Sequence, residues 1–313
     1  MALNIVRRLC AAIVLIVAIC AVVYLLIGSG GQSPGRSILG PGATPEQVAE
    51  QNHELGVDRP LPLQFWDWLS HAAEGDLGSS YVSNQPVADT LIEHLPVSLS
   101  IIVLNLIVVT VLSAVLAILA ARGSVGTDRV VQTLVLIGHV VPAYLIALLL
   151  LLLFAVKLGL FPAFGYVPFA ESPTEWFTAL VLPVTALALG GVAGAALQAR
   201  GALLDVLTTD YVRTLRSRGI SERSILFRHA LRNAAPPWLT SLSLAFAGML
   251  GGTFLIEKVF AMPGLGTLAT ESTTAGDRPV IMGLVLLTGT IVVLINLLTD
   301  LAQMWLVPKA RAA

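Results

Sequence analysis

The sequence predicts an all-α integral membrane protein with about six transmembrane helices. Hydrophobic residues make up 56% of the 313-residue chain, charged residues only 12%, and the mean hydropathy is +0.85. A soluble domain with so few charges would lack the polar surface that it needs, so a bilayer must solvate the chain. Six apolar stretches are long enough to cross a bilayer, which takes about 20 helical residues. They lie at about Leu9–Ile27, Pro96–Ala121, Val130–Val156, Phe177–Gln198, Pro237–Ile256 and Val280–Leu306.

The first apolar stretch follows Arg7 and Arg8, as the core of a cleaved signal peptide would. Its uncharged run of about twenty residues exceeds the ~7–15 of a signal peptide, and no small-x-small cleavage site follows. We therefore interpret it as an uncleaved anchor. Cys10 and Cys20 lie in it about 15 Å apart along a helix, beyond the ~7 Å limit for a disulfide, so we expect two small buried hydrophobes.

Charge distribution predicts the orientation of the chain. Thirteen of the 18 Lys and Arg residues fall on one side of the predicted membrane, which should be cytoplasmic, with both termini inside. Residues 1–28 then form the N-terminal segment and first helix, 29–95 an external region, 96–306 a five-helix core, and 307–313 a cytoplasmic tail. The net charge of −1 argues against a nucleic-acid partner.

Two connecting segments are large enough to dock soluble partners. The external region carries nine acidic residues against two arginines, and the internal loop at 199–236 carries seven arginines against three acidic residues. Aromatic side chains in the external region indicate that it folds and packs on the membrane face. They are Phe65, Trp66, Trp68 and Tyr81.

Sequence motifs for ATP hydrolysis and metalloproteolysis are missing. A P-loop needs Gly-Lys before Ser or Thr, and none of the three lysines follows a glycine. His53-Glu54 lacks the second histidine of a zinc-protease helix, and the histidines do not cluster. We predict no catalytic residue and no metal ligand in this chain.

The internal loop has strong local signals. A helical run beginning at Asp210 should end at Gly219, which can adopt a positive φ, and Ser221 is a good N-cap for a second short helix. Pro236-Pro237 should end this excursion and start the next span. The short helix exposes apolar side chains among arginines, which fits either a protein-docking site or a helix resting on anionic lipid.

This loop resembles the cytoplasmic EAA loop of ABC-importer permeases, a glycine followed further on by an apolar-x-Leu-Pro element. Gly219 matches the glycine, and His229-Ala230-Leu231-Arg232 matches the terminal element. Arg213-Thr214-Leu215 replaces the opening Glu-Ala-Ala, and Arg232 replaces the closing proline. These departures resemble the peptide and nickel branch of the family.

Three further segments resemble dipeptide and oligopeptide permeases, so the resemblance spans nearly the whole chain. The departure is Val307-Pro308-Lys309 in place of Asp-Pro-Arg, which leaves Val307 without an assigned role. The matching segments are Leu55–Pro62, Gly75–Ser80 with Gln85–Val87, and Glu257–Gly266.

The resemblance implies the type I ABC importer permease fold in a bacterial cytoplasmic membrane. Implied partners are a homologous second permease, one or two ABC ATPase subunits that bind ATP and Mg²⁺, an extracytoplasmic binding protein and a peptide substrate. This chain itself would hold no cofactor. Phe227 would enter an ATPase groove, with Arg223 and Arg228 at its rim. The implied ATPase-coupling residues are Arg213, Gly219, Ser221, Glu222, Arg223, Leu226, Phe227, Arg228 and His229, and the implied binding-protein contacts are Asp58, Asp76, Pro263 and Gly264.

Polar or helix-bending residues in the spans are candidates for the pathway, because lipid does not tolerate unpaired polar groups. Packing within the bundle explains several of them equally well, as it does the expected kinks at Pro142 and Pro183. Gly190-x-x-x-Gly194 and Gly248-x-x-x-Gly252 should allow close helix approach. The pathway candidates are Asn105, His139, Pro142, Glu257, Phe260 and Asn296.

Other functions remain open at this point. A self-contained secondary transporter or channel should carry charged residues at mid-membrane, and a membrane scaffold would not need so detailed an internal loop. Permeases for nickel, glutathione and haem share these motifs. Dipeptides or short oligopeptides are the leading substrate prediction.

Overall fold

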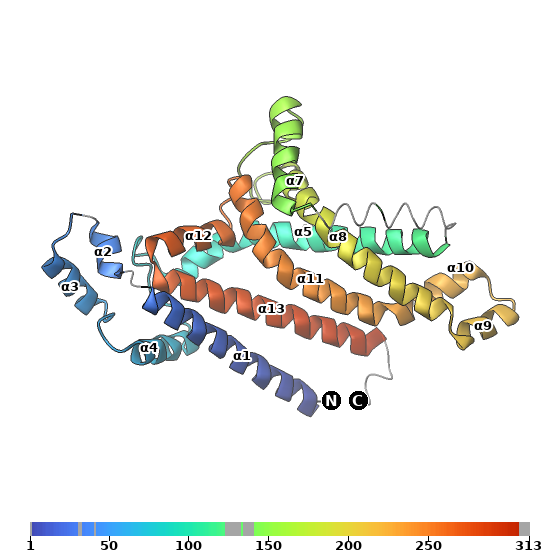
Figure 1. The fold of residues 1–313 in the computed structure, drawn as a ribbon, viewed down its shortest axis with the longest axis horizontal. Coiled ribbons are helices and arrows are strands. Elements are labelled where there is room, and N and C mark those ends of the chain that lie inside the picture. Colours follow the sequence, from blue (N-terminus) through green and yellow to red (C-terminus); the bar gives the residue numbers. More distant parts are fainter. Residues whose placement is uncertain (1, 31–32, 41, 123–132, 134–140, 307–313) are drawn as a thin grey trace. The chain divides into compact units, whose positions relative to one another are not determined.

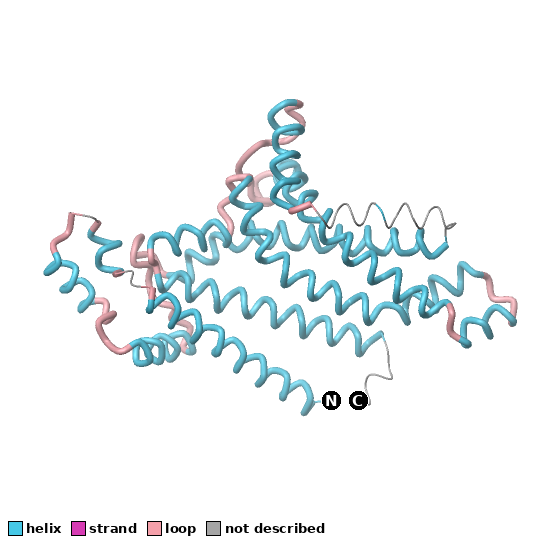
Figure 2. The backbone as a smooth tube through the Cα atoms, in the orientation of Figure 1, coloured by secondary structure: helices cyan, strands magenta, loops and turns pink. Residues whose placement is uncertain are grey.

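The structure, a computed structural model, describes residues 2–30, 33–40, 42–122, 133 and 141–306. Within these residues the regular structure is helical. There is one isolated antiparallel bridge, between Ser79 and Pro86, and no β-strand (Figure 2). The α-helices are α1 (Ala2–Ser29), α2 (Pro34–Leu39), α3 (Pro45–Glu54), α4 (Leu61–Ala73), α5 (Val87–Arg122), α7 (Ala143–Leu150), α8 (Pro173–Leu207), α9 (Asp210–Ser217), α10 (Glu222–Ser224), α11 (Leu231–Val259), α12 (Leu265–Ala275) and α13 (Arg278–Leu306), labelled in Figure 1. Two π-helical segments are η1 (Leu151–Lys157) and η2 (Ile225–Ala230).

Five helical stretches are long and apolar enough to cross a membrane, which confirms five of the expected spans. The remaining expected span, 130–156, lies partly outside the described residues. Its described part forms the shorter apolar helix Ala143–Lys157. The five stretches are Cys10–Ser29, Val87–Ala121, Pro173–Leu207, Glu222–Val259 and Arg278–Gln303.

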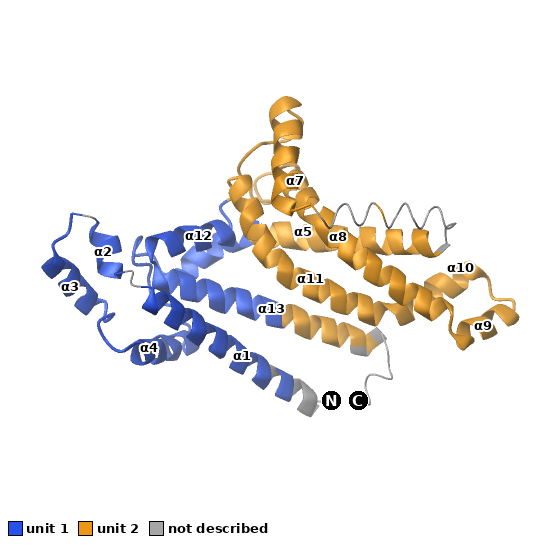
Figure 3. Ribbon diagram, in the orientation of Figure 1, with its two compact units in different colours: residues 1–97, 263–293 blue, residues 98–262, 294–313 orange. Residues whose placement is uncertain are grey.

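The chain forms two compact units (Figure 3). Unit 1 comprises Met1–Val97 and Pro263–Val293, and unit 2 comprises Ser98–Met262 and Leu294–Ala313. Helices α5 and α13 each contribute to both units. The division at residues 28, 95 and 306 refers to a membrane and stays a prediction.

Unit 1 has an aromatic core, as predicted for the external region. Phe65 of α4 is buried with its ring edge-on to Tyr24 of α1, the ring centroids 5.7 Å apart. Trp66, one position along α4, is 63% exposed although its ring centroid lies 6.1 Å from that of Phe65. Cys20 is buried in the same cluster, whereas Cys10 is exposed because α1 buries little of its surface near its start.

Unit 2 is built on the packing of α8 against α11. The expected close approach is wrong at Gly194 and Gly248, where a Cβ would meet nothing within 4 Å, and is confirmed at Gly252, where a Cβ would lie 3.2 Å from Leu187 Cδ2 of α8. The buried face of α8 follows Ala188, Val192 and Ala195 instead. Gly191 lies on that face, where a Cβ would come 3.0 Å from side-chain atoms of Val109 and Met249.

Two expectations about proline are wrong. Pro236 and Pro237 lie inside a continuous helix, because Ala234 and Ala235 just before them are buried and tertiary packing holds the backbone helical. Pro142 does not kink a continuous helix. It precedes α7 with an extended ψ of 134°, a position where a missing N–H costs nothing. Pro183 does lie inside a helix, α8.

Candidate functional site

The richest candidate site is the arginine-rich segment, which we define as residues 208–234 of unit 2. Its first helix, α9, follows α8 after Thr208 and begins at Asp210. Val212 is fully buried while most of α9 is exposed, so one side chain fixes the helix against the protein. The predicted helix at this position is confirmed.

Helix α9 ends in a Schellman motif at Gly219, as the sequence predicts. Gly219 has φ +76°, its N–H donates to the Arg216 carbonyl at 2.9 Å, and the Ile220 N–H donates to the Leu215 carbonyl at 3.2 Å. A Cβ at Gly219 would meet nothing within 4 Å. The backbone angle alone therefore requires glycine here.

An ion pair joins the two sides of this bend. Arg216 donates through Nε to Glu222 Oε1 at 2.7 Å and through Nη2 to Oε2 at 3.3 Å. The hydrogen bond and the charge of Glu222 raise the pKa of Arg216. This two-point pair fixes the angle between guanidinium and carboxylate, which a single contact would not do.

The second helix begins where the sequence predicts, at Ser221. The Ser221 hydroxyl accepts the Ser224 N–H at 3.4 Å, and the chain then continues through η2 into α11. Ile225 and Leu226 are buried, whereas Phe227 is 52% exposed. A shallow hollow beside Phe227 is lined by Ser221, Arg223 and Ser224.

Leu226 is an anchor in the chain's own core. It is 3% exposed and packs with three other buried side chains of unit 2. The wider π-helical turn places Ile225 and Ala230, five residues apart, on the buried side while Phe227 stays outside. The buried partners of Leu226 are Leu203, Ala230 and Ala234.

The remaining predicted coupling residues surround Phe227 or α9. Arg223 and Arg228 are exposed. His229 is half-buried. Arg213 pairs with Asp210 one turn earlier in α9, at 3.1 Å, with both side chains exposed.

The predicted pathway residues do not gather at one point. Asn105 of α5 is fully buried and its Nδ2 lies 3.0 Å from Met249 Sδ of α11. Asn296 of α13 is exposed and accepts a 2.5 Å hydrogen bond from Ser243 of α11. Pro142 starts α7, and His139 lies outside the described residues.

Glu257 is a fully buried carboxylate of unit 2. It is 0% exposed near the end of α11, and Ser98 of α5 donates to its Oε1 at 2.5 Å. Phe260, at the C-cap of α11, is also buried, and its carbonyl accepts the Gly165 N–H. These residues tie α5 and the 158–172 connection to the end of α11.

The predicted binding-protein contacts lie in unit 1. Asp58 holds His53 Nδ1 at 2.7 Å, and both are exposed. Asp76 accepts the Gly78 N–H at 2.8 Å, which shapes the turn after α4. Pro263 is exposed, and the adjacent Gly264 is buried and N-caps α12.

Sequence reasoning missed several residues that shape these sites. Arg216 and Glu222 are six positions apart across a bend, so no helical spacing rule relates them. Asp277 accepts from Ser80 Oγ and the Tyr81 N–H over nearly 200 residues of sequence. No three His, Cys, Asp or Glu side chains gather as metal ligands in the part of the chain that the structure describes.

Comparison with protein families gives two matches that together cover nearly all of the chain. The family described as "Binding-protein-dependent transport system inner membrane component" matches residues 111–312. Its N-terminal counterpart, the "Binding-prot-dependent transport system membrane comp, N-term" family, matches residues 1–102.

Full-length relatives agree with these families. A putative peptide transport system permease protein of Brucella abortus is 38% identical, covering 98% of each chain. A probable peptide ABC transporter permease protein of Sinorhizobium fredii is 36% identical, covering 99% of this chain and 100% of the relative. A glutathione transport system permease protein of Salmonella typhi is 34% identical over 97% of each.

Solved structures share the fold. The MetNI methionine ABC transporter in an inward-facing conformation has a chain that matches with a TM-score of 0.55 and 19% identity, covering 69% of this chain and 96% of that one. A chain of an amino acid ABC transporter crystallised with histidines matches with a TM-score of 0.52 and 17% identity, covering 69% and 94%.

Proposed function

The chain belongs to the family of binding-protein-dependent transport system inner membrane components, and on that premise we propose its cargo and its route of energy coupling. As a member it is the permease subunit of an ABC importer, a non-catalytic multi-pass protein of the inner membrane that works with ATPase and permease subunits. We propose that it carries dipeptides or short oligopeptides. We also propose that the arginine-rich segment docks an ATPase subunit.

The coupling proposal is carried by one observation: Phe227 is exposed while its neighbours Ile225 and Leu226 are buried. An aromatic side chain held outward on a fixed base, with a hollow and exposed arginines beside it, fits insertion into a groove of a partner protein. Arg223 and Arg228 would contact the rim of that groove. Gly219 and the Arg216–Glu222 pair would hold the docking helix at a fixed angle to α9.

The cargo proposal is supported by the names of full-length relatives. Those of Brucella and Sinorhizobium are described as peptide transport permeases. The Salmonella relative favours glutathione, itself a tripeptide, as the second candidate. Uptake of a radiolabelled dipeptide, with unlabelled glutathione as competitor, distinguishes the two cargoes.

The remaining partners follow from the same premise. A binding protein would deliver the cargo to the external surface around α2, α3 and the 263–264 turn, and a second permease would complete the pathway. Both termini would lie in the cytoplasm, on the side of the ATPases. ATP and Mg²⁺ would be bound by the ATPase subunits.

Extraction of the tagged chain in mild detergent, with mass spectrometry of what accompanies it, tests the assembly. Recovery of a second permease and one or two ATPase subunits is the expected result. Recovery of the chain alone, under conditions that preserve other ABC importers, would contradict the proposal and favour a self-contained transporter.

Substitution of Phe227 by Asp tests the coupling site directly. We expect peptide uptake to be lost and the ATPase subunits to dissociate or hydrolyse ATP without transport. The matched control is Phe164→Asp, because Phe164 is 62% exposed, similarly aromatic and outside the arginine-rich segment. Normal uptake by the Phe227→Asp importer would refute the docking role.

A further inference from the structure

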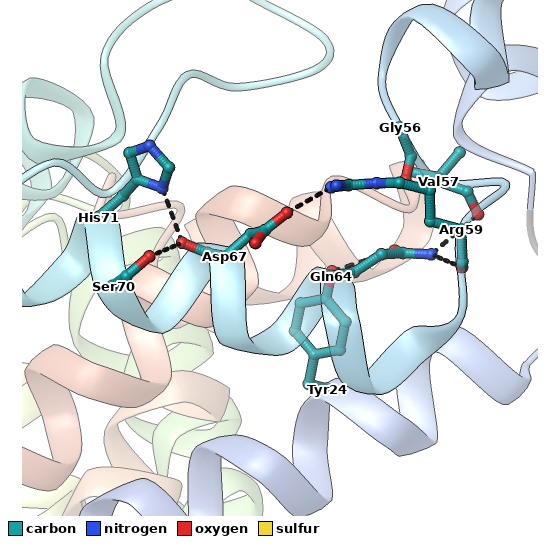
Figure 4. A network of polar contacts seen from close by, with 8 residues as sticks. All are labelled: Tyr24, Gly56, Val57, Arg59, Gln64, Asp67, Ser70 and His71. Atoms are coloured by element: carbon teal, nitrogen blue, oxygen red, sulfur yellow. Dashed lines mark hydrogen bonds and ion pairs between the residues drawn. The ribbon is translucent and has the colours of Figure 1, made fainter.

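A cavity lies within unit 1, away from the arginine-rich segment. It has a volume of about 140 Å³ and is bounded by α1, the α3–α4 turn, α4, the segment before α5 and the first turn of α13. Segments from distant parts of the sequence therefore meet there. Figure 4 shows one wall, where Gln64 lies between Tyr24 and the α3–α4 turn.

The acceptors on this wall are already used. Tyr24 donates its hydroxyl to Gln64 Oε1 at 3.1 Å. The Gln64 amide donates to the Val57 carbonyl at 3.0 Å, and Arg59 Nε donates to the Gly56 carbonyl at 3.3 Å. These bonds fix the wall and occupy one lone pair on each of the three oxygens.

The donors that border the cavity are numerous and two are cationic. Arg59 and Arg278 both line it, and Arg278 is only 8% exposed. Trp68 lines it too, and its buried indole N–H has no acceptor among the described residues. Burial raises the pKa of the bordering Tyr81 to about 12, so this phenol keeps its proton at neutral pH.

Two acidic side chains lie near this region without lining the cavity. Asp67 pairs with Arg59 at 2.7 Å (Figure 4). Asp277 accepts from Ser80 Oγ and the Tyr81 N–H. Both carboxylates are thus bonded to the protein, and Asp67 offsets part of the charge of Arg59, so Arg278 is the principal cationic side chain of the cavity. The first turn of α13 also presents the positive end of its helix dipole to the cavity through Arg278, Pro279 and Met282.

We propose that this cavity is a binding subsite for a single carboxylate group, which the C-terminus of a peptide supplies. The guanidinium fork and indole N–H match a planar anion with two acceptor oxygens. The volume of about 140 Å³ has room for a carboxylate group and the residue that carries it. The proposal rests on the proposed function only for the source of the carboxylate.

Binding is tested with the full chain in its complex, reconstituted in lipid nanodiscs. The probes are glycylglycine, glycylglycinamide and inorganic phosphate, and ligand-observed saturation-transfer NMR gives the dissociation constant of each. We expect saturable binding of glycylglycine, and at least about tenfold weaker binding of the amide, which lacks the charged carboxylate. Equal binding of the two would overturn the proposal, and so would tighter binding of phosphate.

Variants then place the binding in this cavity. Trp68→Phe keeps the aromatic packing and removes only the indole N–H, and Arg59→Gln removes one lining charge. Each should weaken glycylglycine binding by about tenfold. The matched control is Arg36→Gln, a charge loss at an exposed position of α2 in the same unit, which should leave binding unchanged. Trp68→Phe with unchanged affinity would refute the subsite.

Arg278→Gln should abolish binding, and thermal unfolding shows whether this variant still folds. If it does not, Trp68→Phe decides the outcome. Binding is measured without transport. A failed subsite proposal can therefore be told apart from a failed proposal about transport. A chain that binds glycylglycine here and imports no peptide would refute the proposed cargo and leave the subsite intact.

Discussion

Arg216 holds both carboxylate oxygens of Glu222 across the bend at Gly219, with nitrogen-to-oxygen distances of 2.7 and 3.3 Å. The pair closes a turn between α9 and the helix that carries Phe227. Both side chains are about half-exposed, at 44% and 61%, so solvent screens the pair and its contribution to global stability is small. The pair instead sets the direction in which the helix that carries Phe227 leaves α9.

Arg216→Ala should therefore uncouple transport while leaving the fold intact. We expect several-fold lower uptake per ATP hydrolysed, and a change in unfolding free energy below about 1 kcal/mol. Uptake and ATPase activity in proteoliposomes give the ratio. Arg218→Ala is the control, since it removes the same charge at the same bend without breaking a pair. Equal effects of the two variants would show that the Arg216–Glu222 contact has no special role.

Gly219→Ala should loosen the bend, because an alanine at φ +76° costs about 1–2 kcal/mol although no atom obstructs its Cβ. We expect trypsin to cut after Arg218 about 5–30 times faster, as the local opening equilibrium shifts. Gly219→Asn should be milder, since asparagine tolerates the left-handed region. Gly201→Ala, at an ordinary helical glycine with open space, should leave the cleavage rate unchanged.

Gly283→Ala should destabilise unit 1. A Cβ there would lie 2.5 Å from Val87 Cγ1 and 3.1 Å from Leu91 Cδ1, so these side chains must shift, at a cost of about 1–3 kcal/mol. In the same helix, a Cβ at Gly289 would lie an ordinary 3.7 Å from Ile16 Cγ1. Gly289→Ala should be neutral or stabilising. The thermal midpoints in detergent compare them, and a higher midpoint for Gly283→Ala would contradict the packing described here.

The His53–Asp58 pair should depend on pH in a defined window. Hydrogen bonding to Asp58 raises the pKa of His53 above 6.5, and hydrogen bonding to His53 lowers the pKa of Asp58 below 3.8. The His53 contribution is complete below pH 6.5 and is lost as pH rises through its folded-state pKa. The Asp58 contribution is complete above pH 3.8 and is lost as pH falls through its own. The pair is therefore fully formed between these two values.

NMR titration of ring-labelled histidines checks this window. Asp58→Asn should return the pKa of His53 towards its ordinary value. His71 is an internal control, because its pKa is raised chiefly by the Asp67 backbone carbonyl and should not respond to that substitution. An unchanged His53 pKa in Asp58→Asn would exclude the pair in solution.

Local chemistry explains what could be predicted from the sequence. Gly219 and Ser221 act through backbone angles and one hydrogen bond within a few residues, so their roles as helix stop and helix start were readable. The apolar spans were readable because each residue's hydropathy adds independently. The outward position of Phe227 followed from neither signal, since it depends on what Leu226 packs against.

Long-range packing explains the rest. Pro236-Pro237 reads as a helix boundary, yet burial of Ala234 and Ala235 keeps the helix continuous. The glycine spacing in α8 reads as a contact at Gly194, yet the contacting face passes through Gly191. The Ser98–Glu257 and Ser80–Asp277 bonds join residues whose proximity exists only once the helices have assembled.

The unbroken helical path from Glu222 to Val259 has a mechanical consequence. Its 38 residues make a rod about 57 Å long, with Phe227 at one end and Glu257 at the other. The π-helical turn η2 and the internal prolines Pro236 and Pro237 are the points on this path where a helix bends most readily. Gly219 adds a bend just before this path begins. A displacement of Phe227 therefore has one continuous helix through which to reach Glu257, and its size at the buried carboxylate depends on how far these bends give.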